Sequence, residues 1–234
     1  MNIIKEIKNQ YNSFCPAIRL GFQAAFFAVI SMLGTLLYMV FQALQLGAMF
    51  YTQKDFHNIL FTICCGLFFV FMLYVAMVPP LYKATDSFKK SHVKSLKFWG
   101  DTILCLVLVK VLQMFLALLL PSGTNTANQR AINQLFVNGK VTQWYLIIMS
   151  ILVAPLIEET LFRWLPYTLV SSIPIAFILS VLGFTLLHSP DSWFAILIYA
   201  SMASVLNINY ICNGFLGSYM LHILINLSAL LFML

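Results

Sequence analysis

The sequence predicts an all-α fold, a polytopic helical membrane bundle of about seven transmembrane helices preceded by an N-terminal interfacial helix. Of the 234 residues, 62% are hydrophobic and only 9% are charged, whereas soluble domains carry roughly 25% charged residues. The apolar residues form several runs of about 20, the length that crosses a bilayer as a helix. Most charged residues lie between these runs, which favours a membrane-embedded bundle over a soluble domain.

The first segment, residues 1–19, is predicted to be an amphipathic helix at the membrane interface. Its isoleucines Ile3, Ile4 and Ile7 share one helical face, and the charged side chains point elsewhere. The apolar run that follows is too long for the hydrophobic region of a signal peptide. We therefore expect this segment to be retained and to lie on the membrane surface.

The second part, residues 20–142, is predicted to hold three transmembrane helices. The loop Lys83–Lys97 contains five lysines and one acidic residue, so the positive-inside rule places it, and with it the N-terminus, in the cytoplasm. The polar connection Pro121–Thr142 then faces outside. Lys110 lies near the middle of the third helix, where it would snorkel or pair with Asp101. The approximate helix bounds are Leu20–Met49, Asn58–Val78 and Thr102–Leu120.

The third part, residues 143–234, is predicted to be a catalytic core of four helices. Their approximate positions are Tyr145 to a turn around Pro166–Pro174, Ile175–His188, Trp193–Ile208, and Phe215 to the C-terminus.

The rise of a helix predicts which polar residues of this core meet. At 1.5 Å per residue, Glu158 lies roughly 20 Å and His188 roughly 25 Å from the turn at Ser171, so the two side chains reach similar depth. On a straight helix, His222 lies only roughly 10 Å into the membrane. A tilt or break at Gly214 would change that depth.

Two adjacent glutamates and an arginine stand out within this apolar core. After Asp101 the acidic residues are Glu158, Glu159 and Asp191, and no Lys or Arg follows Arg163. Ionisable groups within a membrane are costly and mark a functional site. Since two adjacent buried carboxylates cannot both ionise cheaply, Arg163 is predicted to pair with Glu159, four residues earlier. Glu158 is then left to act as a base.

Two histidines and an asparagine complete the set of polar side chains. His188 and His222 lie within predicted helices, and Asn226 shares a helical face with His222. A carboxylate can take a proton from water, a histidine can hold that proton, and polar donors can stabilise the resulting oxyanion. The sequence therefore predicts water activation for hydrolysis.

Three short patterns in this order resemble the signature of the CPBP family, also called Abi, which includes the type II CAAX prenyl endopeptidases and bacteriocin-processing proteases. The patterns are Glu158-Glu159-x-x-x-Arg163, Phe184-x-x-x-His188 and His222-x-x-x-Asn226, each on its own apolar helix. The resemblance covers about residues 143–230. It implies a helical bundle with an active site inside the membrane.

The resemblance also implies a role for each residue of the signature. Glu158 would activate the attacking water together with His188, and His222 and Asn226 would bind the developing oxyanion. The supporting residues would be Glu159, Arg163 and Phe184, the last packing beside His188.

These observations predict an intramembrane endopeptidase that hydrolyses a peptide bond of a membrane-associated peptide or protein. No cofactor is expected. Zinc bound by the two histidines and a carboxylate is the alternative, but Arg163 would repel a divalent cation and no HExxH motif is present. The expected partners are a peptide or protein substrate and membrane lipid, and the expected location is the bacterial cytoplasmic membrane. Peptide maturation, bacteriocin self-protection and quorum sensing are the pathways that the resemblance suggests.

Other classes of protein fit the sequence less well. The net charge of +6 comes from basic residues between apolar runs rather than from one surface stripe, which argues against nucleic acid. The five cysteines lack CxxC spacing and are interpreted as packing residues. A non-proteolytic scaffold or bacteriocin-immunity protein of the same fold is the main alternative. A transporter would leave the histidines and Asn226 unexplained.

Overall fold

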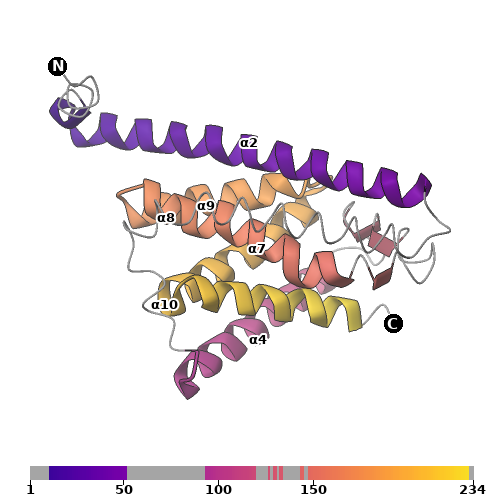
Figure 1. The fold of residues 1–234 in the computed structure, drawn as a ribbon. Coiled ribbons are helices and arrows are strands. Elements are labelled where there is room, and N and C mark those ends of the chain that lie inside the picture. Colours follow the sequence, from indigo (N-terminus) through magenta and orange to yellow (C-terminus); the bar gives the residue numbers. More distant parts are fainter. Residues whose placement is uncertain are drawn as a thin grey trace.

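The computed structural model describes residues 11–51, 93–119, 126, 129–130, 132–133, 143–144 and 147–231, and the described part contains helices and no strand. The predicted all-α class is therefore confirmed. Two short π-helical turns, η2 and η3, interrupt the segment that carries the glutamates. The elements, most of them labelled in Figure 1, are α2 (Pro16–Tyr51), α4 (Leu96–Leu119), η2 (Met149–Val153), α7 (Ala154–Glu159), η3 (Thr160–Trp164), α8 (Leu165–Leu169), α9 (Ile173–Leu187) and α10 (Trp193–Leu231).

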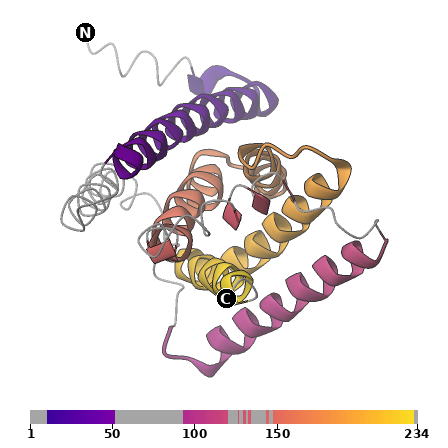
Figure 2. The same cartoon turned by 90° about the vertical axis from the view of Figure 1, so that its right-hand side faces the viewer.

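The helices that carry the site lie between two long flanking helices. Figure 2 shows α2 on one side of the molecule and α4 on the other, with α9 and α10 between them. Helix α4 packs along α10, whereas α2 packs against η3, α8 and α9. The two flanking helices thus cover opposite sides of the candidate site.

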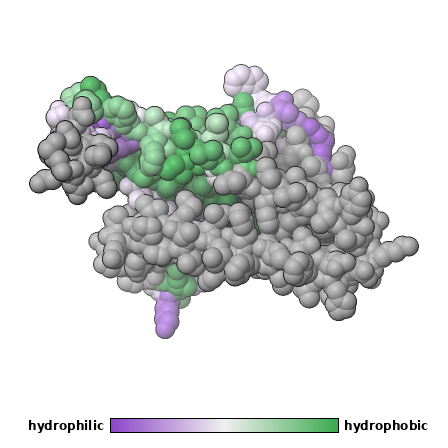
Figure 3. All heavy atoms as spheres, turned by 45° about the horizontal axis from the view of Figure 1, so that its top comes forward, coloured by the Kyte–Doolittle hydropathy of each residue, from purple (hydrophilic) through white to green (hydrophobic). Residues whose placement is uncertain are grey.

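Three described segments are long and apolar enough to cross a membrane: residues 16–36, α4 and α10. Helix α2 exposes Phe22, Phe26 and Val29, each more than half accessible, and Figure 3 shows hydrophobic residues covering the middle of the face on which α2 lies. Large apolar side chains on an outer surface are suited to lipid. The predicted span at 58–78 lies outside the described residues, so the count of about seven spans stays a prediction.

Helices α2 and α4 both begin earlier in the chain than predicted. Helix α2 begins at Pro16, inside the segment predicted to lie at the interface, and residues 1–10 of that segment lie outside the described part. Helix α4 begins at Leu96, six residues before the predicted start, because the hydroxyl of Ser95 accepts a hydrogen bond from the N–H of Phe98 (3.1 Å) and caps the helix.

Lys110 does not pair with Asp101 in this structure. Its Nζ lies 3.5 Å from Oε1 of Gln113, one turn along the same helix. Asp101 instead accepts a hydrogen bond from Nδ2 of Asn213 on α10 (3.4 Å). This contact helps to join α4 to α10.

The glutamate-bearing segment continues as one helical rod to Leu169, so the turn lies within the predicted range Pro166–Pro174 and begins after Pro166. Pro166 lies within α8, directly after the π-helical turn η3. The chain leaves the helix only at Val170, whose φ of −99° and ψ of 122° are extended. The turn into α9 is therefore shorter than expected and lies at residues 170–172.

Helix α10 breaks at Gly214, where the two predicted C-terminal spans meet. Gly214 has φ 70° and ψ −167°, a conformation that a residue with a Cβ rarely adopts. Polar side chains brace the break from within: Nδ2 of Asn209 donates to the carbonyl of Gly217 (2.8 Å), and Nδ2 of Asn213 donates to Oδ1 of Asn209 (2.7 Å). The break turns the last helix toward the glutamates.

Close helix contacts fix the depth of the site. A Cβ at Gly183 on α9 would lie 2.9 Å from the ring of Phe162, and a Cβ at Gly34 on α2 would lie 2.8 Å from Leu161. Both close contacts involve residues of η3, the turn that directly follows Glu159. The packing therefore leaves η3 little freedom to shift.

Candidate active site

Glu159 and Arg163 form a fully buried ion pair beneath the site. Arg163 Nη1 lies 3.2 Å from Glu159 Oε1, and both side chains have no exposed surface. They sit at i and i+4 on one face of the rod, the spacing at which such pairs meet. The pairing predicted from the sequence is confirmed as a contact.

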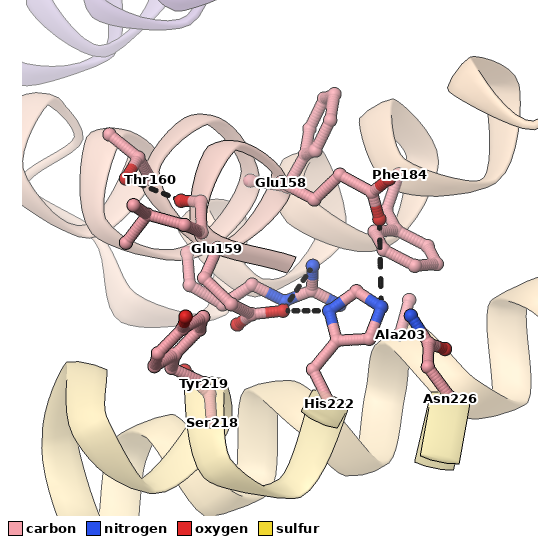
Figure 4. Close-up of polar contacts among 12 residues, drawn as sticks. Glu158, Glu159, Thr160, Phe184, Ala203, Ser218, Tyr219, His222 and Asn226 are labelled. Atoms are coloured by element: carbon pink, nitrogen blue, oxygen red, sulfur yellow. Dashed lines mark hydrogen bonds and ion pairs between the residues drawn. The ribbon is translucent and has the colours of Figure 1, made fainter. Parts of the chain in front are cut away.

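His222 connects the two glutamates. Its Nδ1 lies 2.8 Å from Oε1 of Glu159, and its Nε2 lies 3.6 Å from Oε2 of Glu158 (Figure 4). The straight-helix estimate placed His222 too shallow. The break at Gly214 redirects the last helix, and this places the imidazole level with both carboxylates.

His188 approaches Glu158 from the end of α9. Its Nε2 lies 4.0 Å from Oε2 of Glu158, as the depth estimate predicted. Its Nδ1 lies 2.9 Å from the carbonyl of Phe184. A carbonyl can only accept a hydrogen bond, so Nδ1 carries a proton, and in the neutral ring the lone pair of Nε2 faces Glu158.

Phe184 lies at the centre of the cluster and is fully buried. Its ring centroid is 4.5 Å from that of His188 and 5.8 Å from that of His222. The guanidinium carbon of Arg163 lies 4.3 Å from the same ring, a cation–π distance. Phe184 therefore touches three of the polar side chains and fixes their spacing.

Asn226 lies beside His222 on α10 (Figure 4). Its Nδ2 donates a hydrogen bond to the backbone carbonyl of Ser150 in η2 (2.7 Å). An amide nitrogen carries two protons, so one remains to meet another acceptor. The sequence did not predict the contact with Ser150.

Tyr199 makes a further contact with the site that no sequence motif predicts. Its ring stacks on His188 with centroids 4.3 Å apart, and its hydroxyl donates to Oγ1 of Thr126 (2.8 Å). The stacked pair fixes the plane of the imidazole. No short motif links residue 199 to residue 188, so only the fold reveals this role.

The cluster unites a carboxylate with two imidazoles in a nearly water-free environment. Glu158 is 7% exposed, and its Oε2 has no hydrogen-bond partner within the described part of the chain. The distances of 3.6 and 4.0 Å to the two Nε2 atoms exceed a direct hydrogen bond. The arrangement can take up and hold a proton at this point, as a general base must.

A metal site is not evident in the same region. Among the described residues, no three His, Cys, Asp or Glu side chains form a group that could hold a metal ion. The two Nε2 atoms and the carboxylate of Glu158 are donors of the types that zinc binds. Arg163 lies beside them, and its positive charge opposes a divalent cation.

Comparisons with known proteins identify relatives of this region. Residues 140–228 match the family model described as type II CAAX prenyl endopeptidase Rce1-like, and this stretch contains every residue of the cluster. The UPF0177 protein YbdI of Lactococcus lactis subsp. lactis (strain IL1403) is 30% identical over 141 residues, which cover 59% of this chain and 74% of the relative. No solved structure matches the chain.

Proposed function

The chain belongs to the CPBP family of CAAX-type intramembrane proteases and is an integral membrane protein, and from this premise we propose that it hydrolyses a peptide bond of a membrane-associated peptide or protein. The observation that carries the proposal is the approach of both histidine Nε2 atoms to Oε2 of Glu158. Three separate segments supply these atoms, so their convergence is a property of the fold.

In the proposed reaction, Glu158 is the general base. A water held between Oε2 of Glu158 and Nε2 of His188 attacks the carbonyl carbon of the scissile bond and gives one proton to the carboxylate. The C–N bond then breaks, and the same proton passes to the leaving amine. The stacking of Tyr199 on His188 supports this role, because it keeps Nε2 directed at the reacting water.

His222 and Asn226 are proposed to bind the oxyanion of the tetrahedral intermediate. His222 bridges the two carboxylates, with Nδ1 facing Glu159 and Nε2 facing Glu158. His222 then donates from Nδ1 to Glu159 and from Nε2 toward the oxyanion. The 2.8 Å contact with Glu159 supports this arrangement, because it stabilises the imidazolium that forms.

The variant Glu158→Gln tests the proposal. It keeps the shape of the side chain and removes the base, so cleavage of a quenched fluorescent peptide by the purified protein in detergent should fall by at least roughly 10²-fold. Glu6→Gln is the matched control, since it makes the same change in the predicted interfacial segment, and it should keep full activity. Equal activity in wild type and Glu158→Gln would refute the proposed base and favour a non-proteolytic scaffold or immunity protein.

The proposed mechanism uses no metal. We base this on the charge of Arg163, which pairs with Glu159 at the centre of the cluster. Incubation with a chelator should leave the cleavage rate unchanged. Loss of activity with the chelator and recovery with zinc would instead assign the two histidines and Glu158 as ligands.

The substrate is proposed to be a peptide or protein segment that reaches the site from the membrane. The matching family model carries the name of a CAAX prenyl endopeptidase, and a lipid-modified or apolar peptide would partition into the same layer as the site. We propose the bacterial cytoplasmic membrane as the location, with the N-terminus in the cytoplasm. Peptide maturation, bacteriocin self-protection and quorum sensing remain the candidate pathways.

A further inference from the structure

The carbonyl of Ser150 cannot receive a hydrogen bond from its own helix. The N–H four residues later, that of Ala154, donates to Met149 instead, as the π-helical turn η2 requires. The residue five positions later is Pro155, which has no N–H. Both backbone donors that could reach this carbonyl are therefore unavailable.

Asn226 supplies the missing hydrogen bond. Its Nδ2 lies 2.7 Å from the Ser150 oxygen and comes from α10, 76 residues along the chain. The contact is partly buried, and a carbonyl left unpaired there would cost free energy. We therefore expect this hydrogen bond to hold the Asn226 amide in one orientation. The second proton of Nδ2 then has a fixed direction too.

A second proline in the same rod, Pro166, also leaves a carbonyl to a side chain from another helix, but this carbonyl lies four residues before the proline rather than five, and the side chain is not a candidate site residue. Pro166 follows the π-helical turn η3 and offers no N–H to the carbonyl of Phe162, four residues earlier. That carbonyl accepts a hydrogen bond from the hydroxyl of Ser180 on α9. Both prolines thus leave a carbonyl that a side chain from another helix binds, and only the first of these side chains belongs to the candidate site.

We propose that Pro155 is a positioning residue for Asn226: by leaving the Ser150 carbonyl without a backbone donor, it holds the Asn226 amide in place to donate its second proton to the oxyanion. The inference rests on the proposed function for the identity of the acceptor. The link between Pro155 and Asn226 is independent of the proposed function, because thermal unfolding alone can measure it. π-Helical turns are often found at functional sites, and here the turn has a specific consequence.

The first test is a double-mutant cycle on thermal unfolding, which needs no activity. Asn226→Ala should lower the unfolding midpoint of the otherwise unchanged protein by on the order of 5 °C, because it leaves the Ser150 carbonyl unpaired. In the Pro155→Ala background the new N–H at position 155 pairs with this carbonyl. The same Asn226→Ala change should then lower the midpoint by only about 1 °C.

The second test is kinetic and separates positioning from a merely structural role. Pro155→Ala should lower kcat by about tenfold with KM unchanged, since the amide is no longer fixed in the transition state. Asn226→Ala should lower kcat by roughly 10²–10³-fold, the usual effect of removing one oxyanion donor. The double variant should be as slow as Asn226→Ala alone, because Pro155 acts only through Asn226.

Pro166→Ala and Ser180→Ala form the matched control. This pair should show a similar coupling in thermal stability, because Pro166→Ala likewise adds a backbone N–H that can pair with the carbonyl that Ser180 binds. Pro166→Ala should leave kcat within about twofold of wild type, because Ser180 is not part of the candidate site.

The outcomes distinguish the inference from the proposed function. An equal midpoint shift for Asn226→Ala in both backgrounds would refute the link between Pro155 and Asn226. An unchanged kcat in Pro155→Ala, with cleavage still dependent on Glu158, would refute the positioning role. Cleavage that does not depend on Glu158 would refute the proposed function, and the stability cycle would still decide whether Pro155 holds Asn226.

Discussion

Replacing Arg163 with methionine is expected to lower the free energy of unfolding by about 3–5 kcal/mol, the usual effect of removing one member of a buried ion pair. Glu159 and Arg163 both have no exposed surface, and their closest N and O atoms are 3.2 Å apart. At an effective dielectric constant of about 20, two unit charges at that distance attract by about 5 kcal/mol. Glu159 without its partner would be a buried charge without full compensation.

His222 is expected to limit the loss of unfolding free energy in Arg163→Met. Its Nδ1 also contacts Oε1 of Glu159 at 2.8 Å, so the carboxylate keeps one charged or hydrogen-bonding neighbour. We therefore expect a loss near the lower end, about 3 kcal/mol, which corresponds to a fall of the unfolding midpoint by about 6–12 °C. Thermal unfolding of the purified protein in detergent, followed by tryptophan fluorescence, measures this shift.

The double variant Glu159→Gln with Arg163→Met provides the control. It removes both charges and leaves an amide oxygen that still accepts from His222, so its midpoint should lie above that of Arg163→Met alone. An Arg163→Met protein as stable as wild type would refute the buried-pair argument. If that stable protein were inactive, Arg163 would belong with the catalytic groups.

Two further predictions concern packing and topology. Gly183→Ala should destabilise the protein by about 1–3 kcal/mol, because its Cβ would lie 2.9 Å from the Phe162 ring, whereas Gly100→Ala, with nothing within 4 Å, should not; unfolding midpoints measure both. Cysteine labelling with an impermeant reagent should modify the variant Asn128→Cys and not Ser91→Cys, since the lysine-rich loop is predicted to be cytoplasmic. The reverse labelling pattern would overturn the predicted topology.

The meeting of Glu158 and His188 could be predicted from the sequence because it depends on local geometry. Helix α9 has 15 residues and no break, so the rise per residue gave the depth of His188 correctly. The i and i+4 spacing likewise predicted the contact between Glu159 and Arg163. In a regular helix the constant rise and spacing predict the relative positions of side chains over a few turns.

The depth of His222 could not be predicted in the same way. A glycine in an apolar helix is compatible with a straight helix, a bend or a break, and the positive φ of Gly214 depends on contacts far along the chain. Asn209, Asn213 and Asp101 brace that break across two helices. The sequence showed the glycine but not these partners.

Pro155 and Pro166 both lie inside the helical rod, a position that local preferences disfavour. A proline usually ends a helix at the preceding residue, yet the rod continues past Pro166 to Leu169 before it turns. The helix continues because Ser180, on the next helix, binds the carbonyl that the proline leaves free. Such compensation comes from tertiary structure, which local sequence patterns do not report.

Glu158 is proposed to activate water for peptide hydrolysis inside the bundle. The most direct measurement is mass spectrometry of a peptide library incubated in water enriched in ¹⁸O with wild type or Glu158→Gln, both in lipid nanodiscs. Wild type should form shortened peptides whose new C-terminal carboxyl carries one ¹⁸O atom, and Glu158→Gln should not. The same labelled products from both proteins, at the same rate, would contradict this proposal.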